Sequence, residues 1–112
     1  MNPQELARSG EDAAVALLVK RGYEIVGRNV RMPGGEIDVV ARDGTTIVFV
    51  EVKARQTRRY GSALGAVDAR KRRTLRKLAA EWMQLFAPRA YARFDVVAAD
   101  GARLAHYQDA FR

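Results

Sequence analysis

The chain has 112 residues, no cysteine and a formal net charge of +7. A chain of this length is expected to form one domain, residues 1–112, around one hydrophobic core. The absence of cysteine excludes disulfide bonds and thiolate metal sites, which fits a cytoplasmic protein. The N-terminal sequence carries acids throughout and has no long apolar run, so neither a signal peptide nor a membrane span is expected, and no membrane is among the expected partners.

The positive charge is concentrated in one band of the chain. Residues 1–52 hold six bases and eight acids, residues 53–77 hold ten bases and one acid, and residues 78–112 hold four of each. A concentrated band attracts polyanions, nucleic acid first and anionic membrane second. A solvated helix face would explain evenly spread charge better than it explains this block.

A helix is predicted at the start of the chain, because Asn2-Pro3 resembles a helix cap with proline in the first turn. Apolar residues recur at helical spacing as far as Leu18, and Gly22 provides a stop. Ser9 has an acid three residues later and resembles a capping box. A second helix start at Ser9 is therefore an open alternative to one continuous helix.

Three strands are predicted next, over residues 23–31, 36–42 and 45–53. A turn at Met32–Gly35 separates the first two strands, and Asp43-Gly44, a strong hairpin signal, separates the last two. The polar and basic residues 54–65 then predict a loop.

A second helix is predicted over residues 68–86 and a further strand over residues 91–99. One face of this helix is apolar, with Leu75, Leu78, Ala79, Trp82 and Leu85 at helical spacing. Residues 102–111 form either a last strand or an irregular tail. The order α-β-β-β-α-β-β predicts an α/β fold with a mixed sheet and helices packed on it.

Acidic residues occur inside the two strands that look most like core. Side chains alternate between faces along a strand. A two-residue turn at Asp43-Gly44 would pair Val40 with Ile47 and would place Asp38 and Glu51 on one face as diagonal neighbours, roughly 7–8 Å apart. A three-residue loop would put them on opposite faces. Glu36 and Lys53 share the predicted face.

Clustered carboxylates repel one another and lose hydration unless a cation or hydrogen-bond donors compensate. A hard ion such as Mg²⁺ prefers a few carboxylate oxygens together with water and a phosphate. A lysine beside them can stabilise charge on that phosphate or help to deprotonate an attacking water. An ordinary salt bridge, Glu51 with Lys53, is the competing explanation, and the Asp38 on the partner strand weighs against it.

Two residues outside the strands are candidates for the same site. Glu11 lies at the margin of the first helix's apolar arc and can point over the sheet, although an acid near a helix start also suits the helix dipole. Lys71 lies four residues before Leu75, on the sheet-facing side of the second helix. It either extends to water or meets a phosphate above the carboxylates.

Other polar and aromatic residues have structural interpretations. Trp82 is expected to pack in the core, and Asp95, among apolar residues, is expected to pair with Arg93 or another base. His106 is the only histidine, so a histidine-based nuclease or triad has little to build from.

Asp38 followed by Glu51-Val52-Lys53 across a hairpin resembles the PD-(D/E)XK nuclease superfamily, whose core is αβββαβ. The whole chain resembles the YraN-type family of small bacterial proteins, through "SGEDAAVALLVKRGYEIVGRNVR", "GGEIDVVARDG", "IVFVEVKAR", the helix carrying Lys71, and "RFDVVA". That family is similar to archaeal Holliday-junction resolvases and restriction endonucleases. The resemblance implies a restriction-endonuclease-like fold.

The resemblance also implies a site. Asp38 and Glu51 would bind Mg²⁺ or Mn²⁺ with help from the Val52 carbonyl, Lys53 would be the catalytic lysine, and Glu11 takes the place of a helix-borne glutamate that completes many resolvase sites. Ile37 precedes Asp38 where the superfamily motif has proline.

The leading hypothesis is a metal-dependent endonuclease acting on DNA, including branched or distorted DNA. Its phosphate contacts are expected from the basic band, at Arg55, Arg58, Arg59, Tyr60, Arg70, Lys71 and Arg73. A homodimer would suit a symmetric junction. A non-catalytic nucleic-acid-binding module and a subunit that binds an acidic protein are the alternatives.

Overall fold

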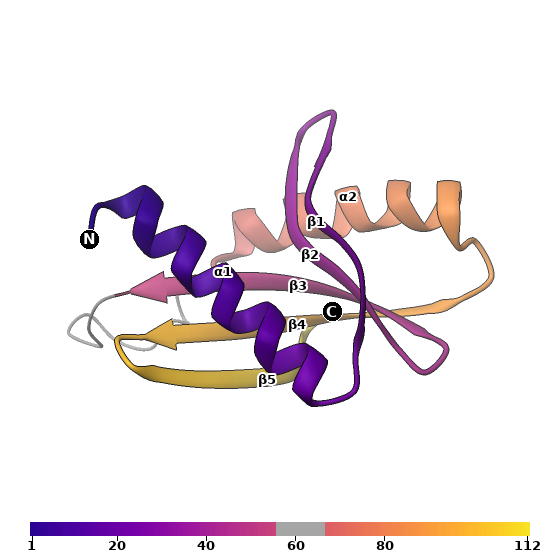
Figure 1. Ribbon diagram of the computed structural model, residues 1–112. Helices are drawn as coiled ribbons and strands as arrows, with labels where there is room; N and C mark the ends of the chain where they lie inside the picture. Colours follow the sequence, from indigo (N-terminus) through magenta and orange to yellow (C-terminus); the bar gives the residue numbers. More distant parts are fainter. Residues whose placement is uncertain (56–66) are drawn as a thin grey trace.

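The structure is a computed structural model that describes residues 1–55 and 67–112 (Figure 1). The chain forms α1 (Pro3–Lys20), β1 (Glu24–Met32), β2 (Gly35–Asp43), β3 (Thr46–Arg55), α2 (Ala69–Phe86), β4 (Tyr91–Asp100) and β5 (Arg103–Phe111). The predicted order of elements is confirmed, and the last element is a strand rather than an irregular tail. Most of the predicted loop falls on residues 56–66, outside the described residues.

The strands form one five-stranded sheet in the order β1-β2-β3-β4-β5. β3 and β4 are parallel, whereas each of the other neighbouring pairs is antiparallel. A parallel pair needs a crossover connection, and α2 lies in that connection. The mixed sheet flanked by helices confirms the predicted α/β class with an αβββαβ core, to which β5 adds an edge strand.

Helix α1 is continuous from Pro3 to Lys20, so no second helix begins at Ser9. The Asn2 side chain caps it by accepting a hydrogen bond from the Glu5 backbone N–H at 2.8 Å. Gly10 faces the sheet, where an added Cβ would lie 2.5 Å from the Ala54 Cβ. This close approach explains a glycine in mid-helix and holds the middle of α1 against β3.

Each face of the sheet carries its own core, as strand alternation requires. The face covered by α1 contains Ala14, Leu18, Tyr23, Val39, Ala41, Val48, Val50 and Val97. The face covered by α2 contains Ile37, Val40, Ile47, Phe49, Leu78, Ala79 and Trp82. Because Phe49 belongs to the α2 face, Glu51 two residues later projects from the same face of β3.

One predicted core residue of α2 is exposed. Trp82 packs edge-to-face on Phe49 as expected, but Leu85 has 69% of its surface exposed. Leu85 lies about 60° around the helix from Trp82, at the margin of the apolar face, because three residues turn a helix by less than one full turn. Within the described parts of the chain, no helix is long and apolar enough to span a bilayer.

The β2–β3 hairpin has a register different from the predicted one. Asp43 is opposite Thr46 and Val40 is opposite Phe49, whereas Val40 was predicted opposite Ile47. The two turn residues are therefore Gly44 and Thr45. Of these, only Gly44 has a positive φ, 61°, which suits a type II′ turn with glycine first. The partner shifts by two residues, so the predicted faces are retained.

The β1–β2 hairpin rises out of the sheet beside α2 (Figure 1). The ladder between β2 and β3 ends at Val39 and Val50. Residues 29–38, which we call the arm, pair only across β1 and β2. At the tip, a Cβ on Gly35 would lie 3.1 Å from the Leu78 side chain on α2. Asp38 therefore lies at the base of the arm, and the tip of the arm packs against α2.

Candidate active site

The candidate site lies where β2 separates from β3. Continuing the register beyond Val39 and Val50 by one residue places Asp38 opposite Glu51. Here a side chain replaces the backbone as hydrogen-bond acceptor: Asp38 Oδ2 accepts a hydrogen bond from the Val52 N–H at 2.8 Å. This bond holds the carboxylate in the fork between the strands. Asp38 is therefore a direct neighbour of Glu51 and not the diagonal neighbour predicted from the sequence.

The Glu51 carboxyl is buried, with 4% of the residue exposed. The pKa of Glu51 is raised to about 8. Burial is the largest cause and the hydrogen-bonded Asp38 carboxyl is the second, whereas the positive charges of Lys71 and Lys53 lower the pKa. Its Oε2 atom is buried and receives no hydrogen bond within the described residues. The pair thus presents carboxyl oxygens of the kind that hard cations prefer as ligands.

The raised pKa of Glu51 predicts that the metal-free protein loses stability as the pH increases. Because its folded pKa exceeds the ordinary value of 4.5, the contribution of Glu51 is fully present below pH 4.5 and is lost as the pH rises to about 8. The loss is on the order of 5 kcal/mol. Glu51→Gln should remove this part of the pH dependence of the free energy of unfolding, measured by urea titration in a chelator between pH 5 and 9.

Glu81→Gln is the matched control, since Glu81 lies on α2 ten residues from Lys71. Its profile should follow that of the wild type. Parallel profiles for the wild type and Glu51→Gln would show that Glu51 does not titrate with a raised pKa.

Two lysines stand on the α2 side of the carboxyl pair. Lys71, in the first turn of α2, places its Nζ 3.4 Å from Glu51 Oε2. Lys53 and Lys71 both line a hollow of about 430 Å³ between the arm and the beginning of α2. Arg70 lines the same hollow. The predicted sheet-facing position of Lys71 is confirmed.

Glu11 approaches the pair from α1. Partial burial, the largest cause, and the negative charge of Asp38 raise the pKa of Glu11, whereas a hydrogen bond from the Asn29 side chain lowers it. Glu11 and Asn29 line a second hollow of about 480 Å³ between α1 and the arm. Within residues 1–55 and 67–112, no three His, Cys, Asp or Glu side chains are close enough to form a ready metal cluster. The carboxyls brought into direct contact are Asp38 and Glu51.

Asn29 is a site residue that the sequence analysis missed. It has a φ of 50°, rare for a residue other than glycine. The flanking pairs Arg28–Val39 and Val30–Ile37 place it opposite Asp38. An asparagine in a strand is an available sequence signal, because asparagine tolerates left-handed backbone better than most residues.

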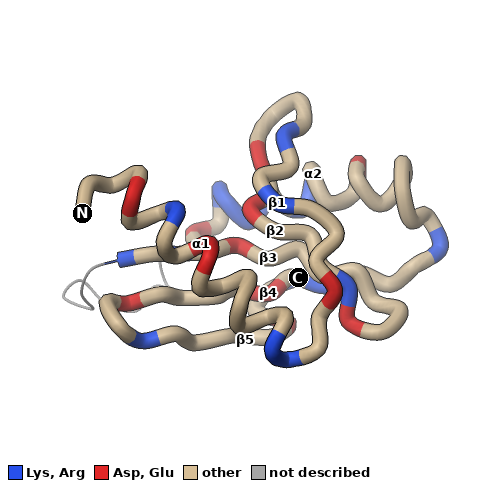
Figure 2. Tube along the Cα trace, viewed as in Figure 1, with Lys and Arg blue, Asp and Glu red and all other residues tan. Residues whose placement is uncertain are grey.

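The basic residues divide into three groups. Arg70 and Arg73 are exposed on α2, and Figure 2 shows Lys and Arg gathered at the beginning of this helix. Arg55, at the end of β3, is paired with Asp100 at 3.5 Å. The predicted contacts Arg58, Arg59 and Tyr60 lie outside the described residues. Of the described basic band, Lys53, Arg70 and Lys71 line the hollow between the arm and α2.

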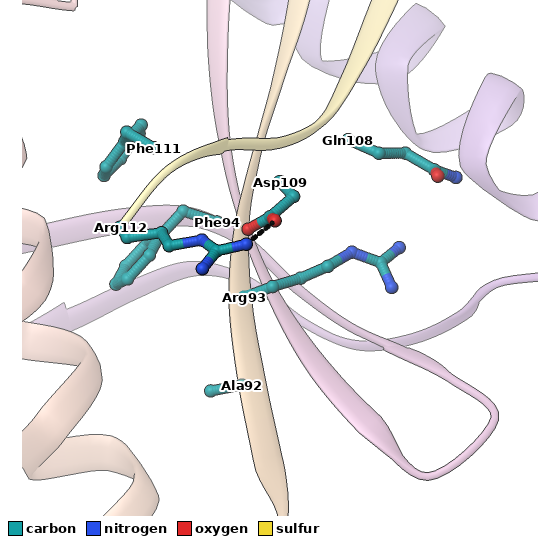
Figure 3. A pocket seen from close by; sticks show the side chains of 7 residues that line it. All are labelled: Ala92, Arg93, Phe94, Gln108, Asp109, Phe111 and Arg112. Atoms are coloured by element: carbon teal, nitrogen blue, oxygen red, sulfur yellow. Dashed lines mark hydrogen bonds and ion pairs between the residues drawn. The ribbon is translucent and has the colours of Figure 1, made fainter.

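Another hollow, of about 580 Å³, lies at the opposite ends of β3 and β4 (Figure 3). Its charged side chains are paired: Arg112 contacts Asp109 at 3.0 Å, and Arg93 contacts Asp95 and Asp43, each at 3.1 Å. Phe94 and Phe111 stack in its wall, with ring centroids 4.8 Å apart. These groups stabilise the sheet and are separate from the carboxyl pair.

Comparison with known proteins places the chain in a family. A family model described as "Uncharacterised protein family UPF0102" matches residues 10–99. A UPF0102 protein of Shewanella amazonensis is 43% identical over 111 residues, which cover 99% of this chain and 100% of the relative. One from Caldicellulosiruptor saccharolyticus is 46% identical over 98 residues, covering 87% and 83%.

A third relative, from Thermodesulfovibrio yellowstonii, is 37% identical over 107 residues and 96% of both chains. The span of the family model contains the positions of Glu11, Asp38, Glu51, Lys53 and Lys71. These matches confirm the family resemblance predicted from the sequence, and the chain belongs to the UPF0102 family.

Proposed function

We propose that the protein is a metal-dependent endonuclease that hydrolyses phosphodiester bonds in DNA, including branched DNA, in the cytoplasm. The observation that carries the proposal is the contact between Asp38 and Glu51 beside Lys53 and Lys71. A buried acid, a half-buried acid and two lysines on one face combine a cation position with positive charge for a phosphate. A salt bridge alone would not bring two carboxyls together.

The donor set suits a hard divalent ion. Carboxylate oxygens are the ligands that Mg²⁺ and Mn²⁺ prefer, and Glu51 Oε2 is a buried oxygen without a hydrogen bond from the described residues. Asp38 and Glu51 would hold the ion, with Glu11 from α1 and the Val52 carbonyl as additional ligands. When bound, such an ion polarises a phosphate oxygen and lowers the pKa of a water molecule.

The side chains of the site have separate roles in this proposal. The Val52 N–H fixes the Asp38 carboxylate at 2.8 Å, so the acid is oriented before the substrate arrives. Lys53 lies in the open hollow, where its ammonium group would stabilise the charge that develops on the phosphate during an in-line attack. The walls formed by α2 and the arm would limit the directions from which DNA enters.

The basic band would hold DNA through backbone phosphates without reading base sequence. Arg70 is exposed and lines the hollow. Arg73 is exposed three residues further along α2, and Arg55 ends the strand that carries Glu51 and Lys53. Phosphate contacts release counterions, so DNA affinity should fall on the order of 100-fold between 50 and 200 mM salt. A symmetric junction would be served by two copies of the protein.

The test is a cleavage assay with Mg²⁺ and with Mn²⁺ on matched four-way, flapped, single-stranded and duplex DNA. The wild type should cut at least one substrate, and Lys53→Ala should lower the rate by about 100-fold or more. Lys77→Ala, which removes an exposed lysine on α2, is the matched control and should retain cleavage.

Salt-sensitive binding without cleavage under any of these conditions would refute the endonuclease and favour a non-catalytic binding module. Failure to retain any of the four DNAs at low salt would refute both and leave an acidic protein as the partner.

A further inference from the structure

Lys71 makes an unusual contact for a lysine at the beginning of a helix. Its backbone N–H donates to the side chain of the N-cap Asp68 at 2.9 Å, which holds the first turn of α2 in helical geometry. Its side chain is 39% exposed, yet its Nζ reaches Glu51 Oε2 at 3.4 Å, where the Glu51 side chain is only 5% exposed. Lys71 therefore extends from an open hollow into a closed carboxyl pair.

The oxygen that Lys71 approaches is the one best suited to a metal ion. Glu51 Oε2 is buried and takes no hydrogen bond from the described residues, and Lys71 is the cation that lowers the pKa of Glu51 most strongly. An ammonium group and a divalent ion cannot both lie against the same oxygen, because cations a few ångströms apart repel each other strongly in a site shielded from water.

We propose that Lys71 is a displaceable counter-ion of the site, so that a divalent ion binding to Asp38 and Glu51 expels its ammonium group from Glu51. This inference rests on the proposed function. The expelled ammonium group then lies in the hollow shared with Lys53 and Arg70, where a phosphate of DNA would enter. The Lys71 ammonium group thus neutralises the negative charge of Glu51 before the metal binds. After the metal binds, it neutralises the negative charge of the DNA phosphate.

The neighbouring bases are placed differently. Arg72 donates to the Val67 carbonyl at 2.8 Å and covers the Phe111 ring, so it points away from the carboxyl pair. Arg70 lines the same hollow as Lys71 but is exposed and is absent from the charges that shift the pKa of Glu51. Arg70 therefore provides a control of equal charge, in the same hollow and one residue away.

The experiment measures the affinity of the DNA-free protein for Mn²⁺ by isothermal titration calorimetry and by electron paramagnetic resonance. The proteins are the wild type, Lys71→Gln and Arg70→Gln. Lys71→Gln should bind Mn²⁺ about tenfold more tightly, because the ion no longer displaces a cation. Arg70→Gln should bind within about twofold of the wild type. Circular dichroism and thermal melting confirm that each variant is folded.

Unchanged affinity in Lys71→Gln, or an equal gain in both variants, would overturn the inference and leave the proposed function standing. Weaker binding in Lys71→Gln would also overturn it, since Lys71 would then support the ion. Absence of Mn²⁺ binding in all three proteins would remove the metal centre itself, and the proposed function would fail together with the inference.

Discussion

Asp38→Asn should lower the rate of DNA cleavage at saturating Mg²⁺ by about 1000-fold, because a metal ligand contributes several kcal/mol of charge stabilisation in the transition state. Asparagine has the size of aspartate, and its carbonyl can still accept the Val52 N–H that Asp38 accepts at 2.8 Å. The fork between β2 and β3 should therefore survive the substitution. The variant removes the negative charge and leaves the local backbone as it is.

Single-turnover kinetics measure the loss of cleavage rate in Asp38→Asn. Fluorescence anisotropy, with a chelator present to remove divalent ions, measures DNA binding separately. Binding should change by less than about threefold, because the proposed phosphate contacts come from the basic band and not from Asp38. Asp12→Asn is the control, since Asp12 is an exposed acid on α1, paired with Arg28 of β1 at 2.7 Å. Cleavage by Asp38→Asn within tenfold of the wild type would remove Asp38 from the metal site.

Asp95→Ala should reduce the free energy of unfolding by about 3–5 kcal/mol, because it strips a buried ionic network of its anion. The Asp95 side chain is fully buried and accepts from Arg93 Nε at 3.1 Å, His106 Nε2 at 2.7 Å and the Asp109 N–H at 3.0 Å. Burial alone would raise the pKa of Asp95, but these hydrogen bonds together lower it. The sole histidine thus has a structural role.

The sign of the pH dependence follows from that lowered pKa. The stabilisation by Asp95 is present above the ordinary carboxyl pKa of 3.8 and is lost as the pH falls through the lower folded value. Urea titration at pH 7 and at pH 3 measures it, and the difference between the wild type and Asp95→Ala should shrink at pH 3. Asp43→Ala removes an exposed partner of the same Arg93, and should cost less than about 1 kcal/mol. Equal losses in the two variants would contradict the prediction.

The sequence predicted the shared face of the carboxyls despite an error in the register. Side chains alternate with a period of two, so moving the turn from Asp43-Gly44 to Gly44-Thr45 slid the partner strand by two residues and returned Asp38 and Glu51 to the same face. A slip of one residue would have separated them. The Asp95–Arg93 pair was equally predictable, because a charge amid apolar residues requires a partner.

Other features depend on information that no local pattern contains. The continuity of α1 past Ser9 depends on Gly10 meeting Ala54 of β3, a contact between distant parts of the chain. The contact of Lys71 with Glu51 depends on how α2 lies across the sheet. Asn29 joins the site only because its left-handed backbone lies opposite Asp38. In each case tertiary packing decides between local alternatives that the sequence leaves open.

The end of the β2–β3 ladder at Val39 and Val50 has a consequence for the evolution of this fold. Residues 29–38 are hydrogen-bonded within their own hairpin, so insertions or deletions at its tip would leave the three central strands and their backbone hydrogen bonds unchanged. Asp38 stands at the base of that hairpin and is fixed by Val52 of the central sheet. A hairpin of another length would therefore change the shape of the entrance to the site while Asp38 and its hydrogen bond from Val52 stay in place.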